Sequence, residues 1–418
     1  MAFDQLPLKP ELQSRLSELG YRQPTPVQQQ AIPLVLAGGD LLAGANTGSG
    51  KTAAFALPLL HNLVGKRASG GNFVSALVLV PTRELAQQVA DSFVSYGAAL
   101  KPKPKVLAVY GGVSVNIQML ALRGGADILV ATPGRLLDLV SSNAVKLNKI
   151  QALVLDEADR MLSLGFTEEL NQVLSLLPKQ KQTLLFSATF PEEVQALARG
   201  LLHQASEIML QNDDEPTLIQ RVFTVNHERK TALLAELIKV NDWQQVLVFA
   251  SAKNSCNRLA QKLAKQGITA EVFHSDKAQG ARNRLLTAFK NGEIRVLVAT
   301  DIAARGIDID KLPVVINYEL PRSPADYMHR IGRSGRAGAS GEAITLICHE
   351  DYHHFKIIEK KNKFRLTREQ YPGFEADEQV PESALARMDK PMAKPEGTGK
   401  KKRKKLPEIN QQLWSKKS

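Results

Sequence analysis

Short apolar runs alternate with longer amphipathic segments along most of the chain. In the first half these runs cover residues 40–44, 76–80, 127–131, 152–155 and 183–186. Their apolar residues are consecutive, which is typical of strands buried on both faces of a parallel sheet. The segments between the runs are long enough for helical crossover connections. The pattern therefore predicts an α/β fold.

The second half of the chain repeats the plan of the first half. The run 77–80 and the following Leu85-Ala86-Gln87 correspond to 247–250 and Leu259-Ala260-Gln261, and the run 129–132 corresponds to 297–300. The separation is about 170 residues, which is long enough for a duplicated domain. Shared composition would explain similar runs but not their matched order. We therefore expect two α/β domains of similar topology, one after the other.

Two changes in composition predict the domain boundaries. Residues 211–217 are polar and acidic and contain Pro216, so residues 211–219 are predicted to link a first domain (1–210) to a second domain (220–365). After about residue 365 the apolar periodicity fades, and from residue 388 the composition is that of a disordered basic tail. We interpret residues 366–418 as a C-terminal extension that includes this tail.

The net charge favours a polyanionic partner. The chain has 54 Lys and Arg against 42 Asp and Glu, which gives +12, and residues 387–418 alone carry 11 basic and 3 acidic residues. The cations of 400–405 would add salt-sensitive affinity for phosphates. A solubilising end without a further role, or a nuclear localisation signal, would have the same composition.

Cysteine content and hydropathy exclude other classes of protein. Two cysteines cannot form a disulfide framework, and no Cys/His cluster has the spacing of zinc ligands. The start lacks the features of a signal peptide, and no apolar run has the length of a membrane span. We expect a cytoplasmic protein, and nothing in the sequence predicts an obligate oligomer, so we expect a monomer.

Residues 45–52 match a phosphate-binding loop between a strand and a helix. Glycines let backbone N–H groups converge on phosphate oxygens, and the helix N-terminus favours negative charge. Lys51 would reach the β- and γ-phosphates of ATP, and Thr52 would bind Mg²⁺. The residues expected to bind nucleotide here are Ala45, Asn46, Thr47, Gly48, Ser49, Gly50, Lys51 and Thr52.

A carboxylate pair at the end of another strand would complete such a site. Asp156 and Glu157 directly follow the apolar run 152–155. Asp156 would hold Mg²⁺ through water, and Glu157 would orient and deprotonate the hydrolytic water. Alone, the pair would also fit a solvated acidic turn. The phosphate loop favours the catalytic interpretation.

Three arginines in the second half would supply the positive charge that phosphoryl transfer needs. Arg330, Arg333 and Arg336 recur at three-residue intervals among glycines. A solvated basic face is the commoner reason for such spacing. The second domain, however, has no Gly-Lys-Thr loop of its own. We therefore expect its arginines to act on ATP across a cleft that ATP closes and hydrolysis opens.

Together these motifs resemble those of the DEAD-box ATP-dependent RNA helicases. The short amino-terminus and the basic tail are most similar to the bacterial RhlE-type subgroup. The resemblance extends from Phe3 to about Phe374 and implies two tandem RecA-like parallel-sheet domains. It rests on motifs that follow one another in the family's order along the chain, at residues 20–28, 45–52, 81–86, 111–112, 132–135, 156–159, 187–189, 303–308 and 329–336.

The resemblance implies further roles at the ATP site. Gln28 would read the adenine edge, Tyr21 would pack on the base, and Phe3 would belong to the same element. Ser187 and Thr189 would couple the nucleotide to domain closure. In the second domain the implied residues are Asp308 for the ribose, His329 for contact with the acidic motif, and Arg333 and Arg336 as arginine fingers. Arg330 is not one of the two fingers.

The resemblance also implies residues that hold RNA by its backbone, with little sequence specificity. In the first domain they are Pro81, Thr82, Arg83, Gly112, Thr132, Gly134 and Arg135. In the second domain they are Ser251, Gln279, Arg282, Thr300, Asp301 and Arg305. Aromatic residues make up 6% of the chain and none interleaves with these motifs, which argues against a stacking platform.

Two positions depart from the commonest form of the family. Ser275 stands where glycine is usual, which bears on the geometry of an RNA-side loop. Ser334 replaces threonine and keeps the hydroxyl.

We therefore expect an RNA-stimulated ATPase that locally unwinds short RNA duplexes or remodels ribonucleoproteins, with ATP and Mg²⁺ as cofactors. Ribosome assembly, RNA degradation and cold adaptation fit equally well, and they would bring protein partners from those processes. Two alternatives stay open: a DNA translocase on the same plan, and an RNA clamp or scaffold that needs ATP binding but not turnover.

Overall fold

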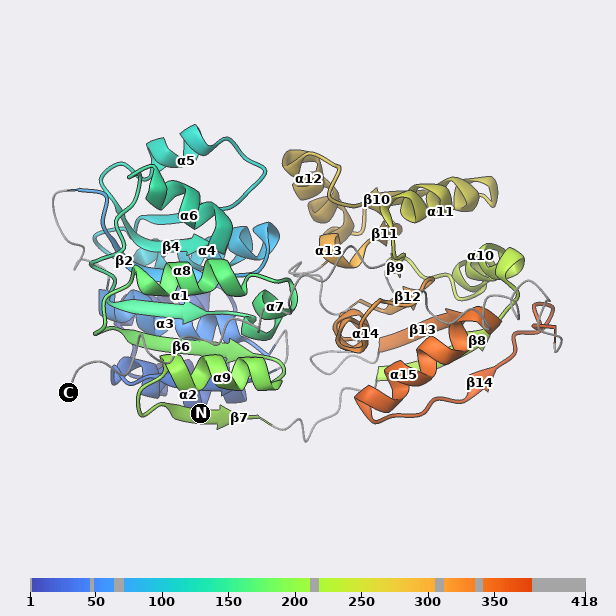
Figure 1. The fold of residues 1–418 in the computed structure, drawn as a ribbon, viewed down its shortest axis with the longest axis horizontal. Helices are drawn as coiled ribbons and strands as arrows, with labels where there is room; N and C mark the ends of the chain where they lie inside the picture. The colour runs from blue at the N-terminus through green and yellow to red at the C-terminus, as the bar shows by residue number, and fades with distance from the viewer. Residues whose placement is uncertain are drawn as a thin grey trace, which may run out of the picture. The chain divides into compact units, whose positions relative to one another are not determined.

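The structure is a computed structural model that describes residues 2–45, 49–63, 71–210, 218–304, 312–334 and 341–377. The expectations for Asn46, Thr47, Gly48, Arg305, Asp308 and Arg336, for most of the linker and for the basic tail fall outside these residues. The described chain divides into a first unit, up to residue 210, and a second unit, from residue 218 onward (Figure 1).

The first unit is a parallel sheet with helices on both faces. Its strands are β1 (Leu41–Gly44), β2 (Val74–Leu79), β3 (Val106–Val109), β4 (Ala126–Ala131), β5 (Ala152–Leu155), β6 (Gln182–Ser187) and β7 (Ser206–Met209). Its helices are α1 (Pro10–Glu18), α2 (Pro26–Leu36), α3 (Lys51–Leu63), α4 (Arg83–Tyr96), α5 (Val115–Ala121), α6 (Pro133–Ser141), α7 (Ala158–Ser163), α8 (Thr167–Ser175) and α9 (Glu192–Leu201), with 3-10 turns at Phe3–Gln5 and Gly97–Ala99.

The second unit has the same architecture. Its strands are β8 (Leu218–Thr224), β9 (Val246–Phe249), β10 (Ala270–Phe273), β11 (Val296–Ala299), β12 (Val314–Asn317), β13 (Gly341–Ile347) and β14 (Arg368–Glu369). Its helices are α10 (Lys230–Val240), α11 (Lys253–Lys265), α12 (Gln279–Lys290), α13 (Asp301–Ala304), α14 (Pro324–Ile331) and α15 (Tyr352–Asn362), with 3-10 turns at His227–Arg229 and His349–Asp351.

Strand order confirms that the two halves share one topology. The first sheet runs β3-β4-β2-β5-β6-β1-β7 and the second β10-β11-β9-β12-β13-β8-β14. The runs matched in the sequence occupy equivalent places, since β2 corresponds to β9 and β4 to β11. Every pairing in both sheets is parallel. The predicted fold, two tandem α/β parallel-sheet domains, is confirmed.

Consecutive apolar residues in the strands serve two cores, one on each face. In β2, Ala76 and Val78 face one core of the first unit, whereas Leu77 and Leu79 face the other. In β9, Val246 and Val248 pack with α10 and α11, and Leu247 and Phe249 pack with α12. Such strands need apolar residues at every position, which is why the runs do not alternate.

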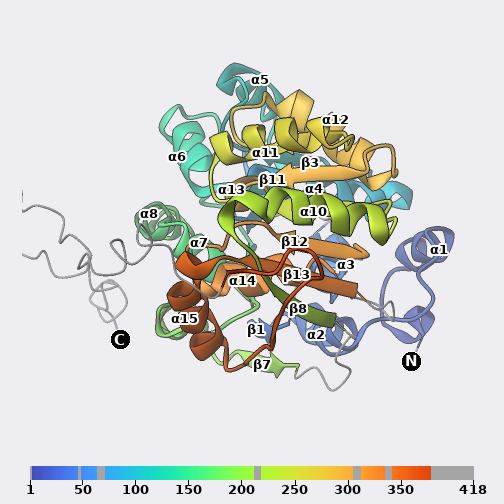
Figure 2. The ribbon, with the colours of Figure 1, turned by 90° about the vertical axis from the view of Figure 1, so that its right-hand side faces the viewer.

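The second unit extends beyond residue 365, where the apolar periodicity fades. Arg368 and Glu369 form β14 beside β8, and Tyr371 and Phe374 pack against the core that contains Phe223. At the other end, β8 begins at Leu218, within the segment expected to be a linker. In Figure 2, α14 and α15 lie together at one end of this sheet and α11 and α12 at the other.

No helix in the described ranges combines the length and the hydropathy that a membrane crossing requires.

Candidate functional site

The predicted site residues of the first unit that follow strands divide between two halves of one sheet edge. The carboxyl ends of parallel strands share an edge, which is where α/β sheets bind ligands. The phosphate loop follows β1, Asp156 and Glu157 follow β5, and Ser187 ends β6. These three strands are adjacent. The predicted RNA residues follow β2, β3 and β4, which form the other adjacent set.

The phosphate loop is tied to the elements on either side of it. Lys51 opens α3, is 6% exposed, and donates from Nζ to the carbonyl oxygen of Ala45 at 2.9 Å. Gly50 has φ +93°, a conformation that favours glycine. A strand, β1, therefore ends just before this segment and a helix, α3, begins at Lys51, as the motif predicts.

Gln28 holds this loop from α2. Its Oε1 accepts from the backbone N–H of Thr25 at 3.0 Å, and its Nε2 donates to the carbonyl oxygen of Gly50 at 3.0 Å. The residue is 3% exposed. Sequence reasoning missed the contact with Gly50, although the Thr-x-x-Gln spacing of a capping box signals the bond to Thr25. The proposed reading of adenine by Gln28 stays a prediction.

The aromatic residues assigned to the base lie beside one another. Phe3 and Tyr21 pack edge to face with ring centroids 6.0 Å apart. Tyr21 also packs on Tyr96 at 5.9 Å, and the two hydroxyls lie 3.1 Å apart. Phe3 is 4% exposed and Tyr21 is 38% exposed. Tyr21 is therefore the ring of this cluster that is accessible to a ligand.

The carboxylate pair after β5 is buried. Asp156 is 3% exposed, and burial raises its pKa to about 6, against the opposing effect of Lys51. Glu157 is 7% exposed and adopts φ 54°, a left-handed conformation that costs energy in residues other than glycine. Its Oε2 accepts from Nη1 of Arg160 at 2.8 Å. Burial of both groups rules out the solvated acidic turn.

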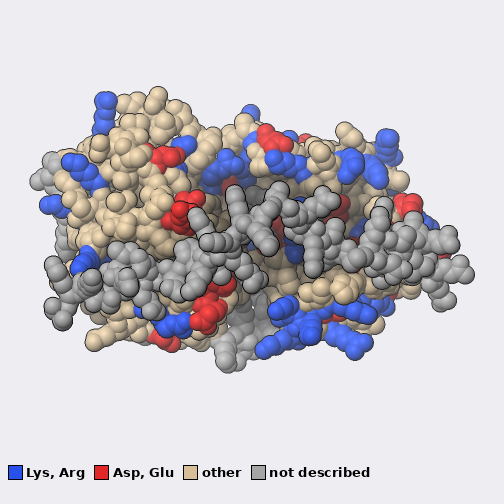
Figure 3. Space-filling view, viewed as in Figure 1, with Lys and Arg blue, Asp and Glu red and all other residues tan. Residues whose placement is uncertain are grey.

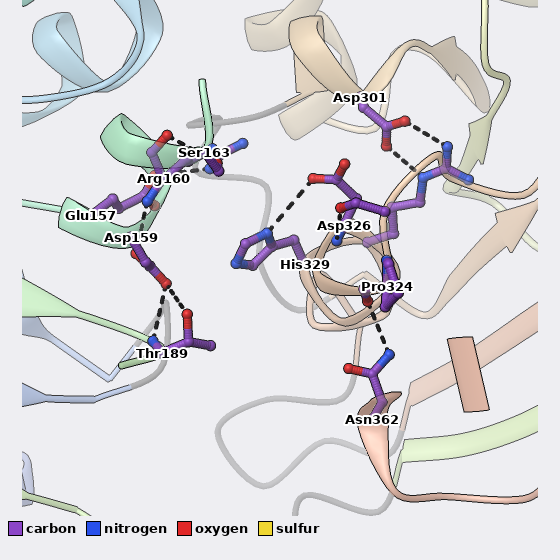
Figure 4. Close-up of polar contacts among 12 residues, drawn as sticks. Glu157, Asp159, Arg160, Ser163, Thr189, Asp301, Pro324, Asp326, His329 and Asn362 are labelled. Atoms are coloured by element: carbon purple, nitrogen blue, oxygen red, sulfur yellow. Dashed lines mark hydrogen bonds and ion pairs between the residues drawn. The ribbon is translucent and has the colours of Figure 1, made fainter. Parts of the chain in front are cut away.

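Asp159 links this acidic turn to the end of β6. Its Oδ2 accepts from the backbone N–H of Thr189 at 3.0 Å and from the Thr189 hydroxyl at 2.7 Å, as Figure 4 shows. The Ser187 hydroxyl donates to the Thr189 carbonyl oxygen at 2.7 Å and accepts from the Asp159 N–H at 3.3 Å. Sequence reasoning assigned no role to Asp159 or Arg160. The only signal was that Asp159 belongs to the segment 156–159 and that Arg160 directly follows it.

The RNA residues predicted in the first unit begin helices or line the turns before them. Thr82 caps α4 by accepting from the Leu85 N–H at 3.3 Å, and Thr132 occupies the N-cap position of α6. Arg83 lies against Gly112, where an added Cβ would be 2.1 Å from its Nη1. Arg135 donates to the Val113 carbonyl oxygen at 2.9 Å. Three turns therefore meet on this half of the edge. Pro81 is buried just before Thr82, and Gly134 has open space around its Cα.

Arg330 is a buried hub of the second unit. It is 2% exposed and forms a two-pronged ion pair with Asp301, at 2.5 and 2.7 Å. Its Nη1 donates to Asn317 Oδ1 at 3.0 Å, and its guanidinium lies 4.8 Å from the centroid of the Phe249 ring. These contacts join the ends of β9, β11 and β12. They give Arg330 a structural role, distinct from the finger role implied for Arg333 and Arg336.

The other RNA residues predicted in the second unit lie at the ends of β9 and β11 and on α12. Ser251 donates to Glu319, from its N–H at 2.6 Å and also from its hydroxyl. Arg282 is buried, with its guanidinium 4.9 Å from the centroid of the Phe273 ring. Thr300 donates from its N–H to the Phe273 carbonyl oxygen at 3.3 Å, and Gln279 Nε2 donates to Asn283 at 3.1 Å.

Helix α14 and the residues that follow it include the remaining predicted ATP residues that the structure describes. His329 faces Asp326 with 4.0 Å between Nδ1 and Oδ1 (Figure 4). Arg333 is 4% exposed, and its carbonyl oxygen accepts from the Leu312 N–H at 3.1 Å. The Ser334 hydroxyl donates to the Leu312 carbonyl oxygen at 2.7 Å, so the hydroxyl kept at this position anchors the turn.

Comparison with known proteins identifies the family. Residues 25–197 match the DEAD/DEAH box helicase family and residues 229–338 match the helicase conserved C-terminal domain. The ATP-dependent RNA helicase CshA of Listeria monocytogenes is 39% identical over 372 residues, 88% of this chain and 70% of the relative. The DEAD-box ATP-dependent RNA helicase CshA of Geobacillus kaustophilus is 36% identical over 372 residues, 88% of this chain and 78% of the relative.

A solved structure extends the similarity to the whole fold. Dbp5 of S. cerevisiae bound to RNA and ADP BeF3 has 32% sequence identity and a TM-score of 0.76, over 88% of this chain and 95% of that one. The two family matches and these identities lead to one conclusion: the chain belongs to the DEAD-box family of ATP-dependent RNA helicases.

Proposed function

We propose that this helicase hydrolyses ATP when RNA is bound and uses the cycle to separate short RNA duplexes locally or to remodel ribonucleoproteins. One observation carries the proposal most directly. The carboxyl edge of the first sheet holds the phosphate loop and the acidic pair on β1 and β5, and the turns with Arg83, Gly112 and Arg135 on the neighbouring strands β2, β3 and β4. ATP and RNA would therefore bind side by side on one rigid edge.

In this proposal each residue of the ATP half has one task. Lys51 binds the β- and γ-phosphates, and Glu157 orients the attacking water and takes its proton. Arg333 and Arg336 of the second unit supply positive charge for the γ-phosphate. Asp159 couples the nucleotide state of this site to Ser187 and Thr189, because it is hydrogen-bonded to both residues.

The side chains fit Mg²⁺ as the partner of ATP. Mg²⁺ in such sites takes one or two carboxylates, and substrate phosphates and water supply the other ligands. Asp156 and the Thr52 hydroxyl would hold it, and no group of three acidic, histidine or cysteine ligands occurs among the residues that the structure describes. The ion would neutralise charge on the β- and γ-phosphates.

Several finer assignments belong to the same proposal. We place the chain in the RhlE-type subgroup, and the basic composition of residues 387–418 supports this placement. We propose a cytoplasmic monomer that binds RNA with little sequence specificity and acts with proteins of ribosome biogenesis or RNA degradation. Net positive charge and the backbone-directed residue set support the choice of RNA as partner.

Steady-state ATP hydrolysis tests the proposed function. Wild-type protein is measured with no polymer, with a structureless RNA and with DNA of the same sequence, beside an Arg333→Ala variant. Stimulation by RNA alone, lost in the variant, is the expected result. Equal stimulation by DNA would favour a translocase. Binding of ATP and RNA without stimulated turnover would favour a clamp or scaffold.

A further inference from the structure

A second cationic surface lies on the last helix of the second unit. Its members are exposed side chains of α15 and of the residues that follow it: Lys356, Lys360, Lys361, Lys363 and Arg365. We call this group the α15 basic strip. Figure 3 shows Lys and Arg side chains gathered along the lower edge of the face drawn, where Figure 1 shows α15. None of the residues predicted above to contact RNA belongs to the strip.

The carboxylate within this segment does not neutralise the strip. Glu359 points inward, is 7% exposed, and accepts from Arg368 at 2.7 and 2.8 Å. It also accepts from the Leu366 N–H at 2.9 Å, and the bonds from Arg368 lower its pKa. Among the described residues, no ion pair within 4.0 Å involves the five cations of the strip. Five like charges therefore face solvent along one short segment.

Packing fixes the face on which the strip lies. Phe355 and Ile358 of α15 pack into the core with Val222 and Tyr327, so the helix presents Lys356, Lys360 and Lys361 outward. Lys363 ends the helix with φ 58°, and the chain turns back there toward β14. His354 and Asn362 bond the carbonyl oxygens of Pro321 and Pro324, which holds both ends of α15.

The strip is separate from the predicted RNA residues of this unit. Ser251, Thr300 and Asp301 follow β9 and β11, whereas α15 packs over β8 and β13, at the other side of β12 in the strand order. Helix stability explains only part of the strip. Lys360 and Lys361 lie in the last turn, where cations suit the helix dipole, but Lys356 precedes that turn and Lys363 and Arg365 follow the helix.

We propose that the α15 basic strip binds the phosphate backbone of RNA that extends beyond the strand held at the carboxyl edges. Four of its five members are lysines, which act as point charges on flexible stems and suit contacts that position RNA without reading bases. The strip would hold a long or structured RNA while the ATP-dependent site acts on a short part of it. This inference rests on the proposed function.

The test compares two full-length variants that lose the same charge. One is Lys356→Gln, Lys360→Gln and Lys361→Gln; the control is Lys101→Gln, Lys103→Gln and Lys179→Gln, which are exposed in the first unit. Binding is measured over a range of salt concentrations to a short single-stranded RNA and to the same strand joined to a long duplex. ATP hydrolysis is measured with saturating short RNA.

We expect the strip variant to lose the extra affinity for the longer RNA. The magnitude of the slope of log affinity against log salt should decrease by about 2 to 3, because three phosphate contacts are lost and each contributes about 0.7 to 0.9. Short-RNA binding and stimulated hydrolysis should match the control. Equal salt slopes for the two variants on the longer RNA would overturn the proposal. Binding of an acidic peptide to the strip would not rescue it. If RNA did not stimulate ATP hydrolysis by the wild-type protein, the proposed function would be rejected instead.

Discussion

Arg160 and Glu157 form an ion pair inside the first unit. The two residues are three apart, Arg160 is 3% exposed and Glu157 is 7% exposed, and Nη1 donates to Oε2 at 2.8 Å. Glu157 itself sits in a left-handed turn at the end of β5. Arg160 therefore holds the carboxylate of the residue to which we assign proton abstraction, and we regard it as a positioning residue.

Replacing Arg160 should impair turnover more than substrate binding. Arg160→Met leaves the buried Glu157 carboxylate without this partner, which should cost about 3 kcal/mol of stability. We expect kcat to fall at least tenfold with little change in KM for ATP, because Glu157 acts on the water and not on the nucleotide. Arg160→Lys should recover part of kcat. Arg123→Met, at an exposed position, is the control. An unchanged kcat in a folded Arg160→Met protein would refute this role.

The raised pKa of Asp156 predicts a pH-dependent stability. Burial raises this pKa to about 6, against about 3.9 in an unfolded chain. Between about pH 4 and pH 6 the folded state binds more protons, so the free energy of unfolding falls as pH rises through this range, by up to about 3 kcal/mol. Asp156→Asn should remove this dependence.

Urea unfolding without nucleotide or Mg²⁺, followed across these pH values, tests the prediction for Asp156. The stability of the Asn variant relative to wild type should increase from about pH 4 to above pH 6. Asp138→Asn, which changes an exposed carboxylate of α6, serves as control. Parallel pH profiles for wild type and Asp156→Asn would contradict the assigned pKa.

The contact between Gln28 and Gly50 predicts how α2 supports ATP binding. Gln28→Glu can still accept from the Thr25 N–H but cannot donate to the Gly50 carbonyl oxygen. We expect affinity for ATP to fall about tenfold, because a buried acceptor loses its donor. In Gly50→Ala, the new Cβ would lie 2.3 Å from Gln28 Nε2, and the same loss should follow.

Gln30→Glu and Gly39→Ala are matched controls for this pair, since Gln30 is exposed and a Cβ on Gly39 would meet nothing within 4 Å. Binding of a fluorescent ATP analogue gives the affinities. If Gln28→Glu and Gln30→Glu bound the analogue equally well, the contact would have no part in nucleotide binding.

We expect Arg330 to stabilise the second unit, whereas Arg333 is expected to act in ATP hydrolysis. Arg330→Lys loses the two-pronged pair with Asp301 and the contact with Phe249, and should destabilise the second unit by about 3 kcal/mol. Thermal unfolding should reveal this loss without any ligand. Arg322→Lys, on the exposed turn before α14, should unfold like wild type. Equal stability of both variants would show that the hub contributes little.

The amino-acid sequence determined the features that depend on neighbouring residues. The phosphate loop at 45–52 and the acidic pair at 156–157 are each continuous in the chain. Runs of apolar residues indicate directly which segments are buried. The matched order of runs predicted two similar domains. For the same reason the family resemblance rests on individual residues of the sequence alone.

Only the tertiary structure decided what depends on residues far apart in the chain. Arg330, Arg333 and Arg336 look alike by spacing, but Arg330 is enclosed by Asp301, Asn317 and Phe249, which lie at or just after the ends of three strands. Likewise β14 could not be read from two residues, because its pairing with β8 and the packing of Tyr371 and Phe374 supply its stability. Strand order, which sets ATP residues beside RNA residues on one edge, arises from crossover connections that local pattern does not encode.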